Sequence, residues 1–421
     1  MGVNYRRSLE EHVEYLSVSI GPRPSTREGE AQAAEYVGDV MRRLTVRNVR
    51  LERFRSGSST YRPFALAFSA ALLGTCLYSV FPEGVPAATA AGLNAVGAWG
   101  MYAETDFINN WMRLLLPRAW SQNVVGEIPA RKERRRRVVL LAHLDTHRTP
   151  IFYSTLAWQK AFRVLVGLCF LSMTVSGALY LAAAAIGWPL LRWAAAPLGG
   201  LQVFGLMMCV HADLTPITPG ANDNASGVAV LLTLAARLTQ TPLMYTDVWA
   251  VATGCEEVGA YGVGSLLDAH GDELREAYLL ALDQVAAGEV TSVTSDGLIR
   301  KHASHEELLS LVREVAREHP GLGVKEHTGV AYTDATVVNK RRFRGMAIVA
   351  QPTANVDQVH WHQISDTMDK VRLDTLQRTH SFVWALLQKI DSIDRGNPAG
   401  HQSPSYSPII ESSSSASWWS S

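Results

Sequence analysis

Hydrophobic residues are concentrated in four long segments that contain no charged residue. These segments are Pro63 to Pro82, Gly84 to Ala103, Val164 to Leu191 and Trp193 to Val210. A helix needs about 20 mainly apolar residues to cross a bilayer, and each segment approaches or exceeds that length. The alternative is a set of core helices in a large soluble domain, but such helices rarely run so far without a charge. The pattern therefore favours two transmembrane hairpins, over 63–103 and 151–213.

The basic residues around these hairpins are distributed unequally. The turns within the hairpins carry Arg192 as their only basic residue, whereas the flanking segments carry many, including the run RKERRRR over 131–137. Because the cytoplasmic flanks of membrane helices are enriched in Lys and Arg, we expect an integral membrane protein whose polar part lies in the cytoplasm.

The polar remainder of the chain alternates between strand-like and helix-like patterns. Strands are expected over 47–55, 123–130, 137–145, 246–254, 277–284 and 345–351, and helices over 5–17, 29–44, 223–240, 305–319 and 371–391. This alternation predicts an α/β fold with a mostly parallel or mixed sheet sandwiched by helices. The tail 394–421 is rich in serine, so we expect it to be disordered.

Composition adds two restrictions. Lys plus Arg and Asp plus Glu are both 39, so the formal net charge is zero and nothing suggests a nucleic acid partner. Three of the four cysteines lie in the apolar segments, which indicates small buried hydrophobic residues and no disulfide framework. The N-terminus lacks the apolar stretch of a secretory signal.

Ionisable residues gather where the predicted strands end. They are His143, Asp145, Asp223, Glu256, Glu257, Asp283 and His362. Singly, each has a structural alternative, such as a helix cap for Asp223 or a solvated surface for the two glutamates and the loop histidines His360 and His362. Together they lie where ligands bind in open α/β sheets.

Mixed histidine and carboxylate ligands are typical of catalytic zinc. A carboxylate shared by two ions about 3.5–4 Å apart gives a two-metal hydrolase. The adjacent Glu256 and Glu257 can then divide the work, one as general base and one as ligand.

The segments AHLDT, GANDNASGVAVLL, TGCEEVGAYG, LALD and HQISDTMDKV follow one another in the chain. In this order they resemble the co-catalytic zinc aminopeptidases, which are related to leucyl aminopeptidase, glutamate carboxypeptidase and glutaminyl cyclase. The resemblance implies two zinc ions, with His143 and Asp283 on one, Glu257 and His362 on the other, and Asp223 bridging. It also implies Glu256 as general base and Asp145 as the carboxylate that orients His143.

Some positions depart from that family. Ala335 stands where many members have histidine, and Trp361 where some have a tyrosine that stabilises the oxyanion; Tyr332 is a candidate substitute. His147 and Arg148 are also unusual. They are either substrate contacts or a polar collar before the membrane, and we favour the collar.

The spacing explains the hairpins as insertions. His143 and Asp223 are 80 positions apart, where the family has a short loop, and loops tolerate added length at little cost. The catalytic domain would comprise 1–62, 104–150 and 214–393. We expect a membrane-anchored exopeptidase, most simply an aminopeptidase, that cleaves peptides with metal-activated water and Glu256 as base. The alternatives are a glutaminyl cyclase-like acyltransferase and an inactive membrane scaffold of the same fold.

Overall fold

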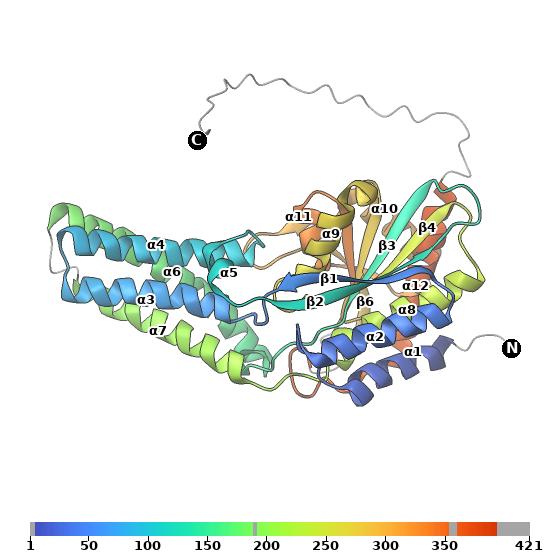
Figure 1. Ribbon diagram of the computed structural model, residues 1–421, viewed down its shortest axis with the longest axis horizontal. Coiled ribbons are helices and arrows are strands. Elements are labelled where there is room, and N and C mark those ends of the chain that lie inside the picture. The colour runs from blue at the N-terminus through green and yellow to red at the C-terminus, as the bar shows by residue number, and fades with distance from the viewer. Residues whose placement is uncertain (1–4, 188–191, 353–359, 394–421) are drawn as a thin grey trace, which may run out of the picture.

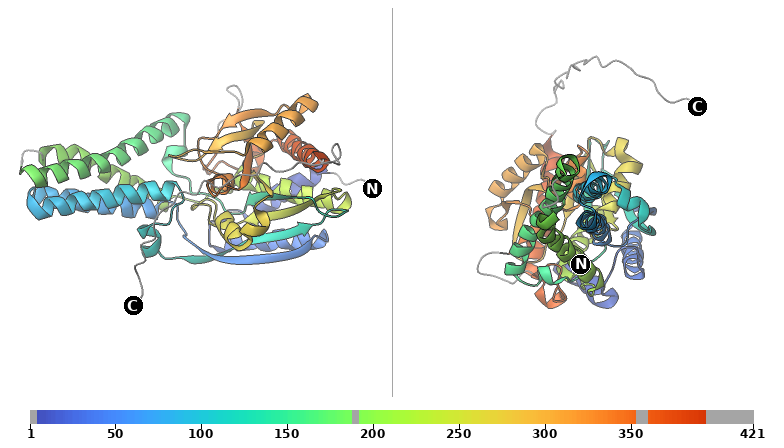
Figure 2. Two further views of the ribbon diagram at one scale, coloured as in Figure 1. Left: turned by 90° about the horizontal axis from the view of Figure 1, so that it is seen from above. Right: turned by 90° about the vertical axis from the view of Figure 1, so that its left-hand side faces the viewer.

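An α/β domain carries a projecting bundle of four long helices (Figure 1). The computed structural model describes residues 5–187, 192–352 and 360–393. The predicted serine-rich tail, 394–421, lies outside the described residues. Two further views show the bundle extending from one end of the α/β domain (Figure 2).

The centre of the α/β domain is a nine-stranded mixed sheet. Its strand order is β1-β2-β4-β3-β5-β9-β6-β7, and β8 pairs with β6. The strands are β1 (Arg47–Ser56), β2 (Ala119–Ile128), β3 (Arg136–His143), β4 (Thr246–Thr253), β5 (Tyr278–Leu282), β6 (Glu289–Asp296), β7 (His302–Ala303), β8 (Lys325–Thr328) and β9 (Arg344–Gln351). Strands β4, β3, β5 and β9 are parallel, so their carboxyl ends meet at one edge of the sheet.

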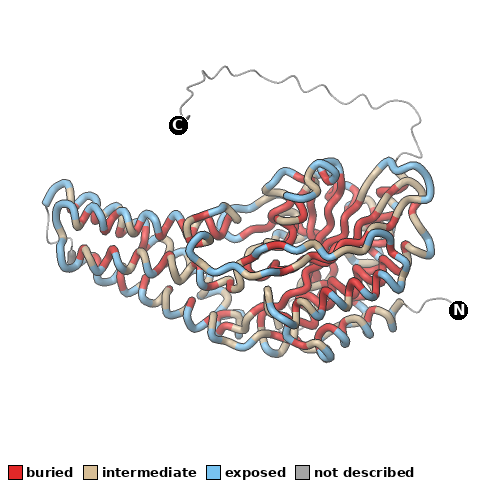
Figure 3. The backbone as a smooth tube through the Cα atoms, viewed as in Figure 1, coloured by how far each residue is buried: buried red, intermediate tan, exposed pale blue. Residues whose placement is uncertain are grey.

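Helices cover both faces of this sheet. One face packs against α2 (Glu28–Arg43), α8 (Gly227–Gln240), α10 (Glu306–Glu318) and α12 (Leu373–Ser392), and the other against α9 (Tyr261–Leu274) and α11 (Asp334–Lys340). Helix α1 (Tyr5–Glu14) lies against α8 and α12. Strand β3 illustrates why: Val138 and Leu140 point into the first core, while Val139 and Leu141 point into the second. The buried residues of both cores line the sheet (Figure 3). The predicted α/β class is confirmed.

The bundle consists of α3 (Arg62–Val80), α4 (Gly84–Thr105), α6 (Leu156–Ile186) and α7 (Arg192–Leu214). A short helix, α5 (Trp111–Leu115), follows α4. Three bundle helices are long and apolar enough to cross a membrane, namely α3, α6 and the part of α7 over Ala195–Leu214. Helix α4 is not among these three, because it is built mainly of alanine and glycine and contains Asn94. It packs between α3 and α6.

A buried polar network joins all four bundle helices. Gln202 of α7 donates to Asn94 of α4 (2.9 Å) and accepts from Thr75 of α3 (2.8 Å). The hydroxyl of Tyr180, on α6, donates to Thr75 (3.1 Å), and Asn94 donates to the carbonyl oxygen of Ala71 (3.1 Å). In an apolar environment such groups must find partners within the protein, so the network fixes how the helices pair.

Glycines allow α3 and α4 to approach closely. A Cβ at Gly97 would lie 2.6 Å from the carbonyl oxygen of Ala67, and one at Gly74 would lie 2.7 Å from that of Ala90. Neither backbone can yield without moving a helix, so the crossing depends on residues that have no side chain.

Gly97→Ala should therefore destabilise the bundle by about 1–3 kcal/mol through overpacking. Gly92 is the matched control, because it lies on the same helix with no atom within 4 Å of an added Cβ. Gly92→Ala should stabilise the helix by about 0.5–1 kcal/mol, since alanine is the better helix former. Thermal unfolding in detergent measures both, and equal effects would contradict the close crossing.

Candidate metal centre

The carboxyl ends of β3, β4 and β5 bring the predicted site residues together. His143 is the last residue of β3, Glu256 and Glu257 follow β4, and Asp283 follows β5. Asp223 comes from the segment Ala221–Ser226 that precedes α8, and His362 comes from the loop before α12. All of these residues and Asp145 are buried. Sequence reasoning thus named a set of residues that the fold gathers in one place.

Asp223 lies between the two histidines. Its Oδ1 is 3.1 Å from Nε2 of His143, and its Oδ2 is 3.2 Å from Nε2 of His362. Nε2 of His143 is also 3.5 Å from Oδ1 of Asp283, and Nε2 of His362 is 3.3 Å from Oε2 of Glu257. Two imidazoles, each with its own carboxylate and one carboxylate in common, are the donor arrangement of a two-ion site.

Several carboxylate oxygens in this cluster receive no hydrogen bond from the described residues. They are Oδ2 of Asp223, Oε1 of Glu256, Oε1 of Glu257 and Oδ1 of Asp283. Buried charges without partners are costly unless they are paired or bind a metal. Two histidines with carboxylates form a donor set that zinc prefers. The residues therefore fit zinc.

The pKa values reflect this crowding of charge. Burial raises the pKa of Glu256 well above its usual range; His143 opposes this shift and Glu257 adds to it. Burial would lower the pKa of His362, but the carboxylates of Glu257 and Asp223 outweigh it and raise the value to about 9. Burial and neighbouring negative charge thus make Glu256 a stronger base than a carboxylate in water.

The carboxylate of Asp145 fixes the turn that carries the two glutamates. It accepts hydrogen bonds from the backbone N–H groups of Glu256 (3.0 Å) and Glu257 (3.1 Å) and from Oγ of Ser25 (2.6 Å). Nδ1 of His143 lies closer to the carbonyl oxygen of Asp145 (3.1 Å) than to its carboxylate (3.6 Å). The backbone of Asp145 therefore orients His143, while its side chain holds the glutamates.

Two supporting residues escaped the sequence analysis. Asp366 accepts from the backbone N–H groups of Asn222 (2.8 Å) and Asp223 (3.0 Å), which positions the bridging carboxylate. The fully buried Arg23 donates to the carbonyl oxygens of Leu144 (2.8 Å) and Gly220 (2.9 Å). Arg23 thus ties the loop after β3 to the loop before Asp223. The only sequence signals were an arginine between prolines and the aspartate of SDTMDK.

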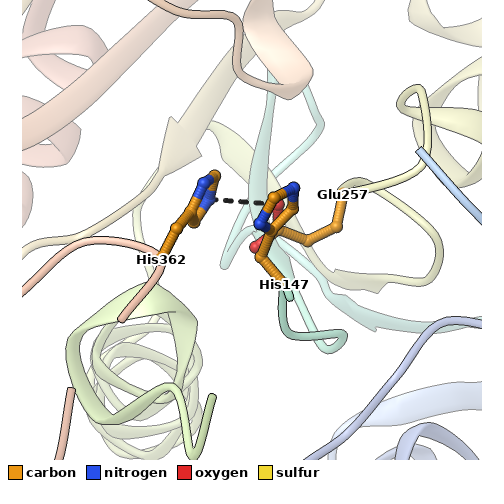
Figure 4. A group of neighbouring side chains, drawn as sticks. All are labelled: His147, Glu257 and His362. Atoms are coloured by element: carbon orange, nitrogen blue, oxygen red, sulfur yellow. Dashed lines mark ion pairs between the residues drawn. The ribbon is translucent and has the colours of Figure 1, made fainter. Parts of the chain in front are cut away.

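The predicted polar collar is wrong for His147. This residue is buried, and its ring stacks on that of His362 with the centroids 3.7 Å apart. Figure 4 shows both histidines beside Glu257. Arg148, by contrast, donates to the carbonyl oxygen of Thr215 (2.6 Å), close to the end of α7. No local pattern of residues indicates that the chain turns back onto the site at this point.

The remaining candidates occupy different surroundings. The hydroxyl of Tyr332 donates to the carbonyl oxygens of Glu256 (3.3 Å) and Glu257 (3.2 Å). Ala335 is packed in the core between the sheet and the helices α9 and α11. His360 hydrogen-bonds Ser365 (2.8 Å), whereas His362 enters the carboxylate cluster.

Part of the chain is similar in sequence to known peptidases and to one curated protein. Residues 199–387 match the model of peptidase family M28. The alkaline phosphatase isozyme conversion protein of Escherichia coli (strain K12) is 31% identical over 146 residues, which are 32% of this chain. The match spans 41% of that relative's length.

Solved structures share the fold. They include BSAP, a zinc aminopeptidase from Bacillus subtilis (TM-score 0.54, 14% identity, 91% of this chain and 94% of that one). The aminopeptidase of Aneurinibacillus sp. strain AM-1 is similar, with a TM-score of 0.55 and 14% identity over 91% of this chain and 93% of that one. A glutaminyl cyclase of Tannerella forsythia is also similar, with a TM-score of 0.52 and 15% identity over 91% of this chain and 98% of that one.

Asp145→Asn should lower zinc affinity about 10- to 100-fold, because an amide cannot accept from both glutamate N–H groups and Ser25. Asp391→Asn is the matched control. Asp391 accepts from two consecutive backbone N–H groups, those of Met244 (2.9 Å) and Tyr245 (2.7 Å), before the opposite end of β4. It should cost about 1–3 kcal/mol of stability and leave zinc binding intact. Chelator competition measures the affinity, and equal zinc loss in both variants would contradict the role of Asp145.

Proposed function

We propose that this chain is a zinc exopeptidase of the kind found in peptidase family M28 and, more specifically, a membrane-anchored aminopeptidase that removes N-terminal residues from peptides. The observation that carries the proposal is Asp223 shared between His143 and His362, with Glu256 beside the cluster and not paired with either histidine. The family match supports a zinc exopeptidase in general. The N-terminal specificity and the anchoring are our own inference.

We assign His143 and Asp283 to one zinc ion, Glu257 and His362 to the other, and Asp223 to both. Zinc, when bound, would polarise the scissile carbonyl and lower the pKa of water. Glu256 accepts the proton of the attacking water at its carboxylate and returns it to the amine nitrogen that leaves. Burial supports this role, because it raises the pKa of Glu256 and so makes its carboxylate a stronger base.

We assign the helices over 63–103 and 151–213 as hairpins that anchor the enzyme in the membrane. Three apolar helices support this assignment, as does the polar network that satisfies the buried side chains between them. Exposed Lys160 and Arg163 lie on α6 near the α/β domain, whereas the turn at the far end of α3 and α4 exposes Phe81 and Val85. This distribution favours a cytoplasmic catalytic domain.

Glu256→Gln should retain two zinc ions and lose at least about 100-fold in turnover, because the amide cannot accept the proton. Glu257→Gln, one position away, should lose one zinc ion, since it removes a ligand. Elemental analysis and a panel of aminoacyl chromogenic substrates measure both quantities. Matching N-acetylated substrates should not react, because an aminopeptidase requires the free amine.

The other functions give different results in the same assays. Release of pyroglutamate from an N-terminal glutaminyl peptide, without hydrolysis of the panel, would point to the cyclase reaction. Zinc binding with neither reaction would point to a scaffold. Hydrolysis that Glu256→Gln leaves unchanged would contradict the role of Glu256.

The orientation can be tested with introduced cysteines. Glu83 lies in the exposed far turn of the bundle, and Asp374 lies on the α/β domain with a largely exposed side chain. In intact cells, a membrane-impermeant thiol reagent should label Glu83→Cys and should label Asp374→Cys only after lysis. The reverse pattern would place the catalytic domain outside the cytoplasm.

A further inference from the structure

The two histidines of the metal centre are held in different ways. Nδ1 of His143 lies 3.1 Å from the carbonyl oxygen of Asp145, an acceptor that fixes its ring. Nδ1 of His362 is buried and has no hydrogen-bond partner among the described residues. Metal-binding histidines almost always donate the second ring N–H to an acceptor, which orients the ring. Among the described residues, therefore, ring contacts and not a hydrogen bond orient His362.

Aromatic rings surround His362 instead. The ring of His147 stacks on it, with centroids 3.7 Å apart and planes at 16°. The ring of Tyr153 meets it edge-on at 4.6 Å and 87°, and Trp361 lies beside it at 4.4 Å. One flat face and one edge together restrict both tilt and rotation of the imidazole.

The stacked arrangement prevents His147 and His362 from sharing one ion, although nitrogen atoms of both lie near Glu257. Zinc binds in the plane of an imidazole at about 2.0–2.1 Å from the nitrogen. An ion between two nearly parallel rings 3.7 Å apart would lie far out of both planes. His147 therefore contacts a ligand and is not itself a ligand of the same ion.

Hydrogen bonds hold His147 in turn. Its Nδ1 is 2.7 Å from the carbonyl oxygen of Arg148, so Nδ1 carries the hydrogen. Its Nε2 is then an acceptor and lies 3.2 Å from the hydroxyl of Tyr61. The ring is thus fixed at both nitrogens, which makes it a rigid surface for His362.

The tyrosines that contact the rings of His147 and His362 lie at the end of the helical bundle that adjoins the α/β domain. Tyr61 directly precedes α3, and Tyr153 ends a short helical turn three residues before α6. Phe152, next to Tyr153, stacks on Phe162 of α6 with centroids 3.9 Å apart. The aromatic contacts around His362 are therefore continuous with both hairpins.

We propose that His147 is a positioning residue for His362, and that Tyr61 and Tyr153 connect this positioning to the ends of the two hairpins that adjoin the α/β domain. The inference rests on the proposed function insofar as His362 binds zinc. It gives the hairpins a part in building the metal centre in addition to anchoring the chain.

The test uses the full-length protein in detergent, with zinc affinity by chelator competition and the visible spectrum of the Co²⁺-substituted protein. His147→Ala should lower the affinity for one of the two zinc ions about 10- to 100-fold, as the loss of a residue that supports a ligand does. It should also change the Co²⁺ spectrum. His147→Phe keeps an aromatic face and should recover most of that affinity. His380→Ala is the matched control, because His380 is also buried and contacts an aromatic ring, that of Tyr5, away from the site.

Wild-type affinity and spectrum in His147→Ala would overturn the proposal, as would an equal loss in His147→Phe that is still folded. Tyr61→Phe keeps its ring but loses the hydrogen bond to His147, and it should lower zinc affinity less than His147→Ala does. A larger loss of affinity in Tyr61→Phe would contradict the proposal that Tyr61 acts through His147. His362→Ala must lose one ion. If it retains both, the ligand assignment of the proposed function fails, whatever His147→Ala shows.

Discussion

The burial of several carboxylates in one small volume is the constraint around which this structure is organised. Asp223, Glu256, Glu257 and Asp283 are each buried, and each has an oxygen that accepts no hydrogen bond from the described residues. Like charges so close together in a medium of low dielectric constant repel strongly unless cations lie between them. The fold supplies two imidazoles and a donor set suited to zinc. The parallel strands, together with the hydrogen bonds accepted by Asp145 and Asp366, hold the carboxylates where bound zinc would neutralise them.

Two helices of the bundle lie between site residues along the chain. The chain leaves β3 at His143, passes His147 and Tyr153, forms α6 and α7, and returns to Asp223. The segment that forms these helices therefore starts and finishes beside the candidate metal centre, and its first residues contact His362. Arg23 bridges the same two loops through their carbonyl oxygens. The packing of the bundle and the geometry of the site therefore depend on one set of contacts.

Sequence reasoning reached the fold class and the candidate ligands because both follow local rules. Apolar runs predicted the central strands, and strand-end positions predicted which polar residues would meet. Strand β6 and the short strands β7 and β8 were not predicted, since they lack a strong apolar alternation and are stabilised by pairing. Helix α4 was predicted to span the membrane because its segment lacks charge, but with its alanine, glycine and Asn94 it is not among the described helices that are apolar enough to do so.

By itself, the sequence determined the α/β class, the apolar character of the inserted helices and the residue types available to bind metal. These properties depend on composition and on spacing along the chain. Only the tertiary structure decided that His147 lies against His362, that Arg23 joins two loops and that the Asp145 side chain holds the glutamates. Those contacts join residues more than a hundred positions apart, and no local pattern encodes which surfaces meet when the sheet and bundle pack together.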